Sequence, residues 1–265
     1  ISFSSCTDLS ETLYSEIAAE EYEFTDRDYQ AMFAPVYSSL RDMYWGWYSM
    51  ADIMDQSSDV WCIPYRIGIG WGDLYVSLHK HEFHSQIAHF DVAWNRAYSG
   101  INSCNKLLDD PKIQEDEKTS SQLRAYRAMY YYLLFDLFRN VPLDTQFAHE
   151  EGWLPEQAST QEMWDFLISE LNDIKGKCGN DNIMGKINNY AVNMMLAKLY
   201  LNHNAYFRGA NELSYDDSDK SWYGKCIDEL NEIINSGVYS LSNNYLDNFK
   251  EDISTIVACL RYIAI

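Results

Sequence analysis

Four histidines lie close together in the sequence and could bind a metal ion. They are His79, His81, His84 and His89, and Glu82 stands among them. Imidazole and carboxylate groups are common zinc ligands, so this cluster is a candidate metal centre. The segment 81–84 is, however, one residue shorter than the H-E-x-x-H motif, and its two histidines would not share one face of a helix. We therefore expect solvated or packed imidazoles and no metal site.

Catalytic motifs are the next chemistry to consider. The sequence contains no G-x-S-x-G, no P-loop and no G-x-G-x-x-G that opens a helix. A glycosidase needs two carboxylates at a defined separation, but the 40 acidic residues make accidental pairs unavoidable and no pattern singles one out. The sequence predicts no enzyme and no cofactor, and a glycoside hydrolase stays only as a third hypothesis.

Charge and aromatic content narrow the class of ligand. The formal net charge is -20 with a pI near 4.5, and no run of Lys and Arg interrupts it, so phosphate backbones are repelled and nucleic acid is a poor partner. Tyr, Phe and Trp number 21, 11 and 8, more than a helical core usually needs. Rings are thus available for a surface that binds flat ligands such as sugars.

Cys6 differs from the other five cysteines in its surroundings. It follows the small, mildly apolar residues 1–5 and precedes the polar, acidic stretch 7–11. This arrangement looks like the end of a bacterial lipoprotein signal peptide, with Cys6 lipidated and residues 1–24 forming the lipoprotein N-terminus and linker. The alternative is an ordinary cysteine in a frayed terminus. No other segment of the sequence is apolar and long enough to span a membrane.

The elements that would position such groups are helices. Apolar residues recur at spacings of three and four, which predicts helices at 25–51, 91–108, 115–139, 159–175, 186–206 and 221–235. Thr25 begins a T-x-x-D cap, Ser159 opens a capping box with Glu162, and Asn140 followed by Pro142 ends the third helix. The pair 186–206 and 221–235 has the spacing of a tetratricopeptide-like hairpin. The fold class is therefore all-α, a helical-hairpin array.

Residues 55–90 break this pattern. Gly68, Gly70 and Gly72 alternate with apolar residues, and Pro64 interrupts the segment. Long loops in compact domains are usually functional, so we expect a long irregular insertion that carries the site.

Three polar residues fall among the apolar positions of the predicted helices. Asn102 and Asn105 lie on the inner face of 91–108, and Arg127 lies in the middle of the inner face of 115–139. Buried amides need hydrogen-bond partners and a buried guanidinium needs a carboxylate or several carbonyls. We expect structural roles for all three, with ligand binding as the alternative.

Ordered motifs give the chain a resemblance to a known family. They are Ser57-Ser58-Asp59, Pro64-Tyr65-Arg66, Trp71-Gly72-Asp73, Leu78-His79-Lys80-His81, Trp94 to Asn105, Leu123 to Leu143 and Asn235 to Phe249. In this order they resemble the N-terminal half of the SusD/RagB family. The resemblance covers about Asp28 to Phe249, and its most specific part is the R-A-x(3)-Y helix that ends before Val141-Pro142. The sequence departs from the family at Asn140, where glycine is usual, and over 65–73, where T-R-G-G-x-W-Y-D-G is usual.

The resemblance implies a SusD-like helical domain at 25–252 with the insertion at 55–90, followed by a truncated or non-native segment at 253–265. It also implies a cell-surface lipoprotein of the outer membrane that binds an oligosaccharide or related nutrient without catalysis. Such a protein delivers its ligand to a SusC-like TonB-dependent transporter.

Four residues are carried over from the family as ligand-binding: Asp59, Arg66, Trp71 and Asp73. An indole face can cover the apolar face of a pyranose, while Arg and Asp side chains form paired hydrogen bonds with hydroxyls. The alternative is an ion pair and a packed tryptophan that only hold the loop. The competing function is a tetratricopeptide-type scaffold whose groove binds a peptide or protein.

Overall fold

The computed structural model describes residues 25–58, 60–65, 72–183, 186–208, 220–241 and 244–246. Ten helices occur in this part of the chain: α1 (Asp26–Tyr44), α2 (Met50–Gln56), α3 (Gly72–His79), α4 (Ala88–Leu108), α5 (Pro111–Glu115), α6 (Glu117–Phe138), α7 (Thr160–Ile174), α8 (Asn189–Leu201), α9 (His203–Tyr206) and α10 (Ser221–Asn235). Every regular element among the described residues is a helix, so the predicted all-α class is confirmed. None of these helices has the length and apolarity needed to cross a bilayer.

The chain divides into two compact units, residues 1–34 and 35–265, with the boundary inside α1. In the first unit, Thr25 and Asp28 cap the start of α1 reciprocally. The Asp28 amide donates to Thr25 Oγ1 at 3.3 Å, and the Thr25 amide donates to Asp28 Oδ2 at 2.9 Å. This is the predicted T-x-x-D cap.

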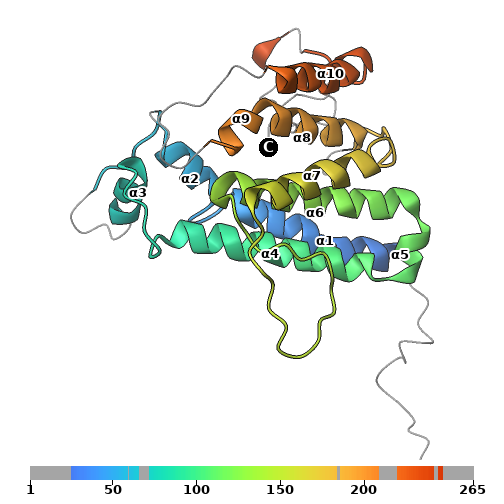
Figure 1. The fold of residues 1–265 in the computed structure, drawn as a ribbon, viewed down its shortest axis with the longest axis horizontal. Helices are drawn as coiled ribbons and strands as arrows, with labels where there is room; N and C mark the ends of the chain where they lie inside the picture. Colours follow the sequence, from blue (N-terminus) through green and yellow to red (C-terminus); the bar gives the residue numbers. More distant parts are fainter. Residues whose placement is uncertain are drawn as a thin grey trace, which may run out of the picture. The chain divides into compact units, whose positions relative to one another are not determined.

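The helices of the second unit pack in a consecutive series (Figure 1). Helix α4 packs on α6, α6 on α7, α7 on α8, and α8 on α10. Helices α8 and α10 run antiparallel, because Tyr200 stacks on Trp222 at one end of the pair while Tyr190 contacts Tyr239 at the other. The predicted helical hairpin is thus confirmed, with bounds of 189–201 and 221–235.

Helix α1 is shorter than the predicted 25–51. It ends at Tyr44, after which Gly46 has φ 137° and Tyr48 has φ 59°, values outside the right-handed helical region. Ser49 then caps a separate helix, α2, by accepting a hydrogen bond from the Asp52 amide at 3.4 Å. Trp47, which the predicted helix 25–51 included, lies in the turn between α1 and α2 and is 71% exposed.

Helix α8 buries more than one stripe of its surface. Its fully buried residues are Val192, Leu196 and Leu199, whereas Leu201, an apolar residue of the predicted helix 186–206, is 52% exposed. The reason is that α8 packs between α7 and α10, so contacts cover two sides of it instead of one stripe.

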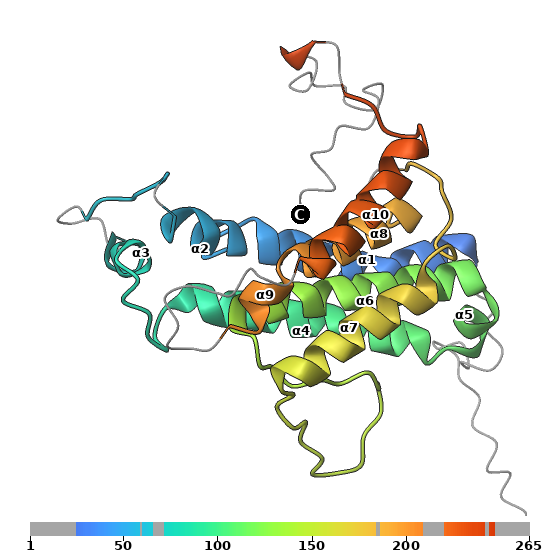
Figure 2. The same ribbon diagram turned by 45° about the horizontal axis from the view of Figure 1, so that its top comes forward.

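A long loop joins α6 to α7 and projects away from the helices in both views (Figures 1 and 2). We call residues 139–159 the α6–α7 loop. Its ends are held together, because the Ala158 amide donates to Val141 O at 3.0 Å and an isolated bridge joins Pro142 to Gln157. At its start Arg139 has φ 64° and ψ -78°, a tight turn in which the Asn140 amide donates to Phe138 O at 2.8 Å, and this turn ends α6. The Asn140 side chain donates to Ala158 O at 3.1 Å.

Candidate functional site

Most of the predicted site lies outside the residues that the structure describes. Asp59, Arg66 and Trp71 fall in its gaps, as does Cys6, and so does the segment 253–265. Asp73 belongs to the first turn of α3, but its side chain is likewise outside the description. Helix α3 itself lies within 55–90, the range expected to be irregular. The ligand-binding roles of these four residues therefore remain predictions.

Exposed aromatic rings precede residues 66–71 in the sequence. Trp45 is 68% exposed in the turn after α1, while Trp61 and Tyr65, which follow α2, are 57% and 58% exposed. Two contacts hold this region to its surroundings, because the Ile63 amide donates to Gln56 Oε1 at 3.0 Å and His81 Nε2 lies 2.8 Å from Ser57 O. Trp61 and Tyr65 thus leave two large rings in solvent within the predicted insertion at 55–90.

The four histidines differ in how far they are buried. His79, His81 and His84 are exposed, whereas His89 is fully buried on α4. Among the described residues, no group of three or more His, Cys, Asp or Glu could hold a metal ion.

His89 packs between two tyrosines and forms no hydrogen bond through its ring nitrogens. Its ring centroid lies 4.9 Å from those of Tyr48 and Tyr75, and its Nε2 lies 3.7 Å from Asp52 Oδ2, beyond hydrogen-bond distance. The Tyr75 hydroxyl instead donates to Asp52 Oδ2 at 3.1 Å, and burial together with this carboxylate raises the pKa of Tyr75 to about 12. Burial lowers the pKa of His89 from its ordinary 6.5, and the nearby Asp52 opposes the shift only partly. His89 is therefore neutral at pH 7.

A pH-dependent loss of stability follows from this burial. Because the unfolded chain binds a proton at His89 more readily than the folded chain, the free energy of unfolding should fall as the pH drops below about 6.5. In His89→Gln, which cannot titrate there, the difference in unfolding free energy between about pH 7.5 and about pH 5.5 should be smaller than in the wild type. Urea titrations at both pH values measure this. Equal pH dependence in the two proteins would contradict the assignment.

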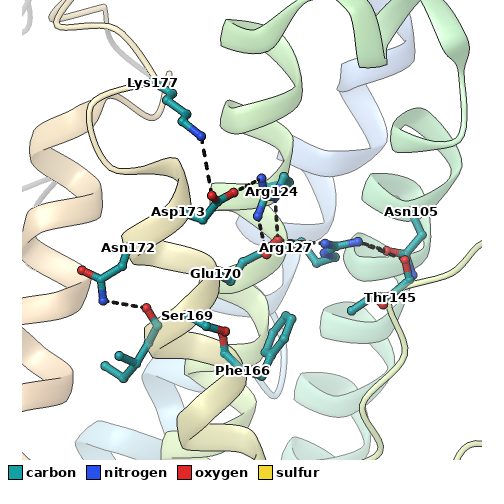
Figure 3. Close-up of polar contacts among 11 residues, drawn as sticks. Asn105, Arg124, Arg127, Thr145, Phe166, Ser169, Glu170, Asn172, Asp173 and Lys177 are labelled. Carbon is teal, nitrogen blue, oxygen red and sulfur yellow. Dashed lines mark hydrogen bonds and ion pairs between the residues drawn. The ribbon is translucent and has the colours of Figure 1, made fainter.

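A second polar cluster joins α6, α7 and the α6–α7 loop (Figure 3). Arg124 and Arg127 of α6 both contact Glu170 of α7, with Arg124 Nη2 at 2.7 Å from Oε2 and Arg127 Nη2 at 2.8 Å from Oε1. Arg124 Nη1 also contacts Asp173 at 2.6 Å. Arg127 is 7% exposed, so the predicted structural ion pair is confirmed, and its partner is Glu170.

Arg127 extends this cluster to α4 and to the loop. Its Nη1 donates to Asn105 Oδ1 at 2.9 Å and to Thr145 O at 3.1 Å. Asn105 Nδ2 in turn donates to the carbonyl oxygens of Asp144 and Gln146, at 3.2 Å and 3.1 Å. The structural role predicted for Asn105 is confirmed, whereas Asn102 is exposed and the same prediction for it is wrong. The helix is oriented so that Asn105 faces α6 and Asn102 does not.

A pocket of about 320 Å³ opens beside this cluster, between the end of α4 and the α6–α7 loop. It is lined by Asn105, Leu108, Asp109, Thr145, Gln146, Phe147 and Ala148. No sequence motif indicated it.

Comparisons with known proteins identify the fold. No protein-family model and no curated protein sequence matches the chain. Among solved structures, a laminarin-binding SusD-like protein matches with a TM-score of 0.69 and 21% identity, covering 88% of this chain and 50% of its own. A SusD-superfamily protein from Bacteroides vulgatus matches with a TM-score of 0.67 and 14% identity, over 88% of this chain and 48% of its own.

A third structure was solved with a bound sugar. It is surface glycan-binding protein A from Bacteroides thetaiotaomicron in complex with laminarihexaose, with a TM-score of 0.62 and 20% identity over 86% of this chain and 47% of its own. The chain thus spans about half the length of the structures that it matches. It has the SusD-like, tetratricopeptide-like helical fold that the ordered motifs predicted.

Proposed function

We propose that this chain belongs to a non-catalytic glycan-binding protein of the bacterial cell surface, which captures an oligosaccharide or related nutrient. The observation that carries the proposal is the SusD-like fold, shared with solved proteins described as binding laminarin and laminarihexaose. The charge of -20 further favours a neutral ligand over an anionic one.

The ligand would bind at the insertion formed by residues 55–90. Trp71 would cover one face of a sugar ring, and Asp59, Arg66 and Asp73 would bind its hydroxyls in pairs. The exposed rings of Trp61 and Tyr65 support this location, because they provide further flat apolar surface within the same segment.

The bound ligand would be delivered to a SusC-like TonB-dependent transporter, with Cys6 carrying the lipid anchor in the outer membrane. Affinity purification from native membranes tests this partner. Recovery of a TonB-dependent transporter with wild-type protein is expected, and its consistent absence would argue against delivery by this route.

Replacing Trp71 is the direct test of the binding site. We expect Trp71→Ala to lower the affinity for the bound oligosaccharide by about tenfold or more, equivalent to about 1.4 kcal/mol, because the ring loses its stacking surface. Isothermal titration calorimetry with laminarihexaose and a xylogluco-oligosaccharide measures this. Ile234→Ala, at an exposed apolar position on α10, is the control and should bind as the wild type does.

Two results would count against capture. Peptide binding that does not depend on Trp71 would favour the tetratricopeptide-type scaffold. Release of reducing sugar from the same oligosaccharides would point to a glycoside hydrolase.

A further inference from the structure

We propose that the pocket between the end of α4 and the α6–α7 loop is a second saccharide subsite, which binds a single neutral sugar ring. This inference rests on the proposed function, because it assumes that the ligand is a saccharide. It concerns a different part of the chain, because the two walls of the pocket, residues 105–109 and 145–148, both follow the insertion at 55–90 in the sequence. Neither wall includes any of the four residues predicted to bind the ligand.

The size of the pocket suits a small ligand. Its volume of about 320 Å³ lies at the lower end of the range for ligand pockets, roughly 300–1,000 Å³. Such a volume favours one ring of a longer chain over an extended segment.

The walls of the pocket are fixed before any ligand arrives. Asn105 is 3% exposed, and its amide nitrogen binds the backbone carbonyls of Asp144 and Gln146. Asp144 is held again by Tyr131, whose hydroxyl donates to Asp144 O at 2.6 Å and accepts from the Asp144 amide at 2.8 Å. A loop that is already ordered loses little conformational entropy when it binds, which favours affinity.

The ion pair of Arg127 and Glu170 supports the same wall. Arg127 Nη1 donates hydrogen bonds to both Asn105 Oδ1 and Thr145 O, while Arg127 Nη2 donates to Glu170 Oε1. These two residues do not line the pocket, so they are positioning residues. Their arrangement explains why a loop without regular secondary structure keeps a defined shape at residues 144–148.

The side chains around the pocket match the chemistry of a sugar. Asp109, Thr145 and Gln146 are exposed and supply a carboxylate, a hydroxyl and an amide, which together accept and donate hydrogen bonds to neighbouring hydroxyls. Phe147, 39% exposed, and Leu108 supply apolar surface for the C–H face of a ring.

The charge of the lining excludes the anionic class of ligand. None of the seven lining residues is basic, and Asp109 adds a negative charge to a chain whose net charge is already -20. Phosphate and carboxylate groups would be repelled. A cationic peptide side chain could pair with Asp109, but it would leave the Thr145 hydroxyl and the Gln146 amide without a ligand partner. Peptide binding is therefore one outcome of the test.

The test is a titration followed by nuclear magnetic resonance, with glucose and laminarihexaose as probes and the complete chain labelled with nitrogen-15. The side-chain amide signals of Asn105 and Gln146 report on the pocket. They should shift with both sugars, in the wild type and in Trp71→Ala alike. Phe147→Ala and Asp109→Asn should each weaken the affinity measured from these signals by about tenfold.

Matched controls separate the pocket from the rest of the loop. Leu154→Ala and Glu151→Gln change an exposed apolar residue and an exposed carboxylate of the same loop that do not line the pocket. Both should bind sugar at the pocket as the wild type does. A loss as large as that of Phe147→Ala in these controls would overturn the assignment.

The outcomes distinguish this inference from the proposed function. If calorimetry detects Trp71-dependent sugar binding while the Asn105 and Gln146 signals stay unmoved, the subsite is wrong and the proposed function stands. If neither method detects sugar binding, both are wrong. If a lysine-containing peptide shifts these signals and the sugars do not, the pocket is a peptide site and the inference is overturned.

Discussion

Glu170→Ala is expected to lower the free energy of unfolding by about 3–5 kcal/mol, the usual cost of removing one partner of a buried ion pair. Glu170 is the carboxylate that Arg127 and Arg124 share, and its side chain is 11% exposed. Without it, the guanidinium of Arg127, which is 9% exposed as a side chain, keeps only the neutral oxygens of Asn105 and Thr145. Urea denaturation at pH 7 measures the loss.

Asp173→Ala is the matched control. Asp173 also binds Arg124, at 2.6 Å, but its side chain is 55% exposed, so water replaces it when it is removed. We expect a much smaller loss of stability than for Glu170→Ala. Equal losses in the two variants would show that burial does not determine the strength of this cluster.

Acid should weaken the same ion pair. Burial alone would raise the pKa of Glu170, but hydrogen bonds from Arg124 and Arg127 outweigh it and hold that pKa below its ordinary 4.5. The stabilisation is therefore present above about pH 4.5 and is lost as the pH falls through the lower pKa of the folded state. In Glu170→Ala this part of the acid dependence should be absent.

Local patterns predicted the parts of this fold that depend on neighbouring residues. The caps at Thr25 and Ser159 were correct, because each needs only two side chains three residues apart. The separate helix α2 was missed, although Ser49 caps it through an equally local hydrogen bond from the Asp52 amide. Apolar residues recur at helical spacing through Trp47, so the sequence pattern did not reveal the turn between α1 and α2.

Tertiary packing determines which polar residues of a helix are buried and which partners they contact, and apolar periodicity alone does not predict either. Asn102 and Asn105 are three residues apart and fit the same predicted stripe, yet only Asn105 is buried, because it faces Arg127 on α6. The need of Arg127 for a carboxylate could be predicted from one helix, but the identity of Glu170, 43 residues away in sequence, could not.

The same distinction between local patterns and tertiary contacts applies to the candidate site. Ordered motifs predicted the segment around Trp71, since each motif is a short stretch of sequence. The pocket at the α6–α7 loop depends on hydrogen bonds between residues 39 and 41 positions apart, as from Asn105 to Asp144 and Gln146. No spacing rule in a single sequence predicts such contacts.

Gly100→Ala is expected to destabilise the protein by about 3 kcal/mol, at the upper end of the usual cost of overpacking a core. Gly100 lies on α4 where that helix packs on α6, and a Cβ atom there would lie only 2.1 Å from Cζ of Tyr130. Tyr130 is fully buried and its hydroxyl donates to the carbonyl oxygen of Val36, so its ring has no space to move into. The two helices would have to separate, and thermal or urea unfolding measures the loss.

Gly224→Ala provides a control with the opposite sign. Gly224 lies inside α10 and a Cβ atom there would meet nothing within 4 Å. Alanine should therefore add about 0.5–1 kcal/mol of stability, because it favours the helix over the unfolded chain without a clash. If Gly100→Ala also stabilised the protein, α4 and α6 could not approach as closely as described. The contact between Gly100 and Tyr130 would then not determine the spacing of the two helices that carry Asn105 and Arg127.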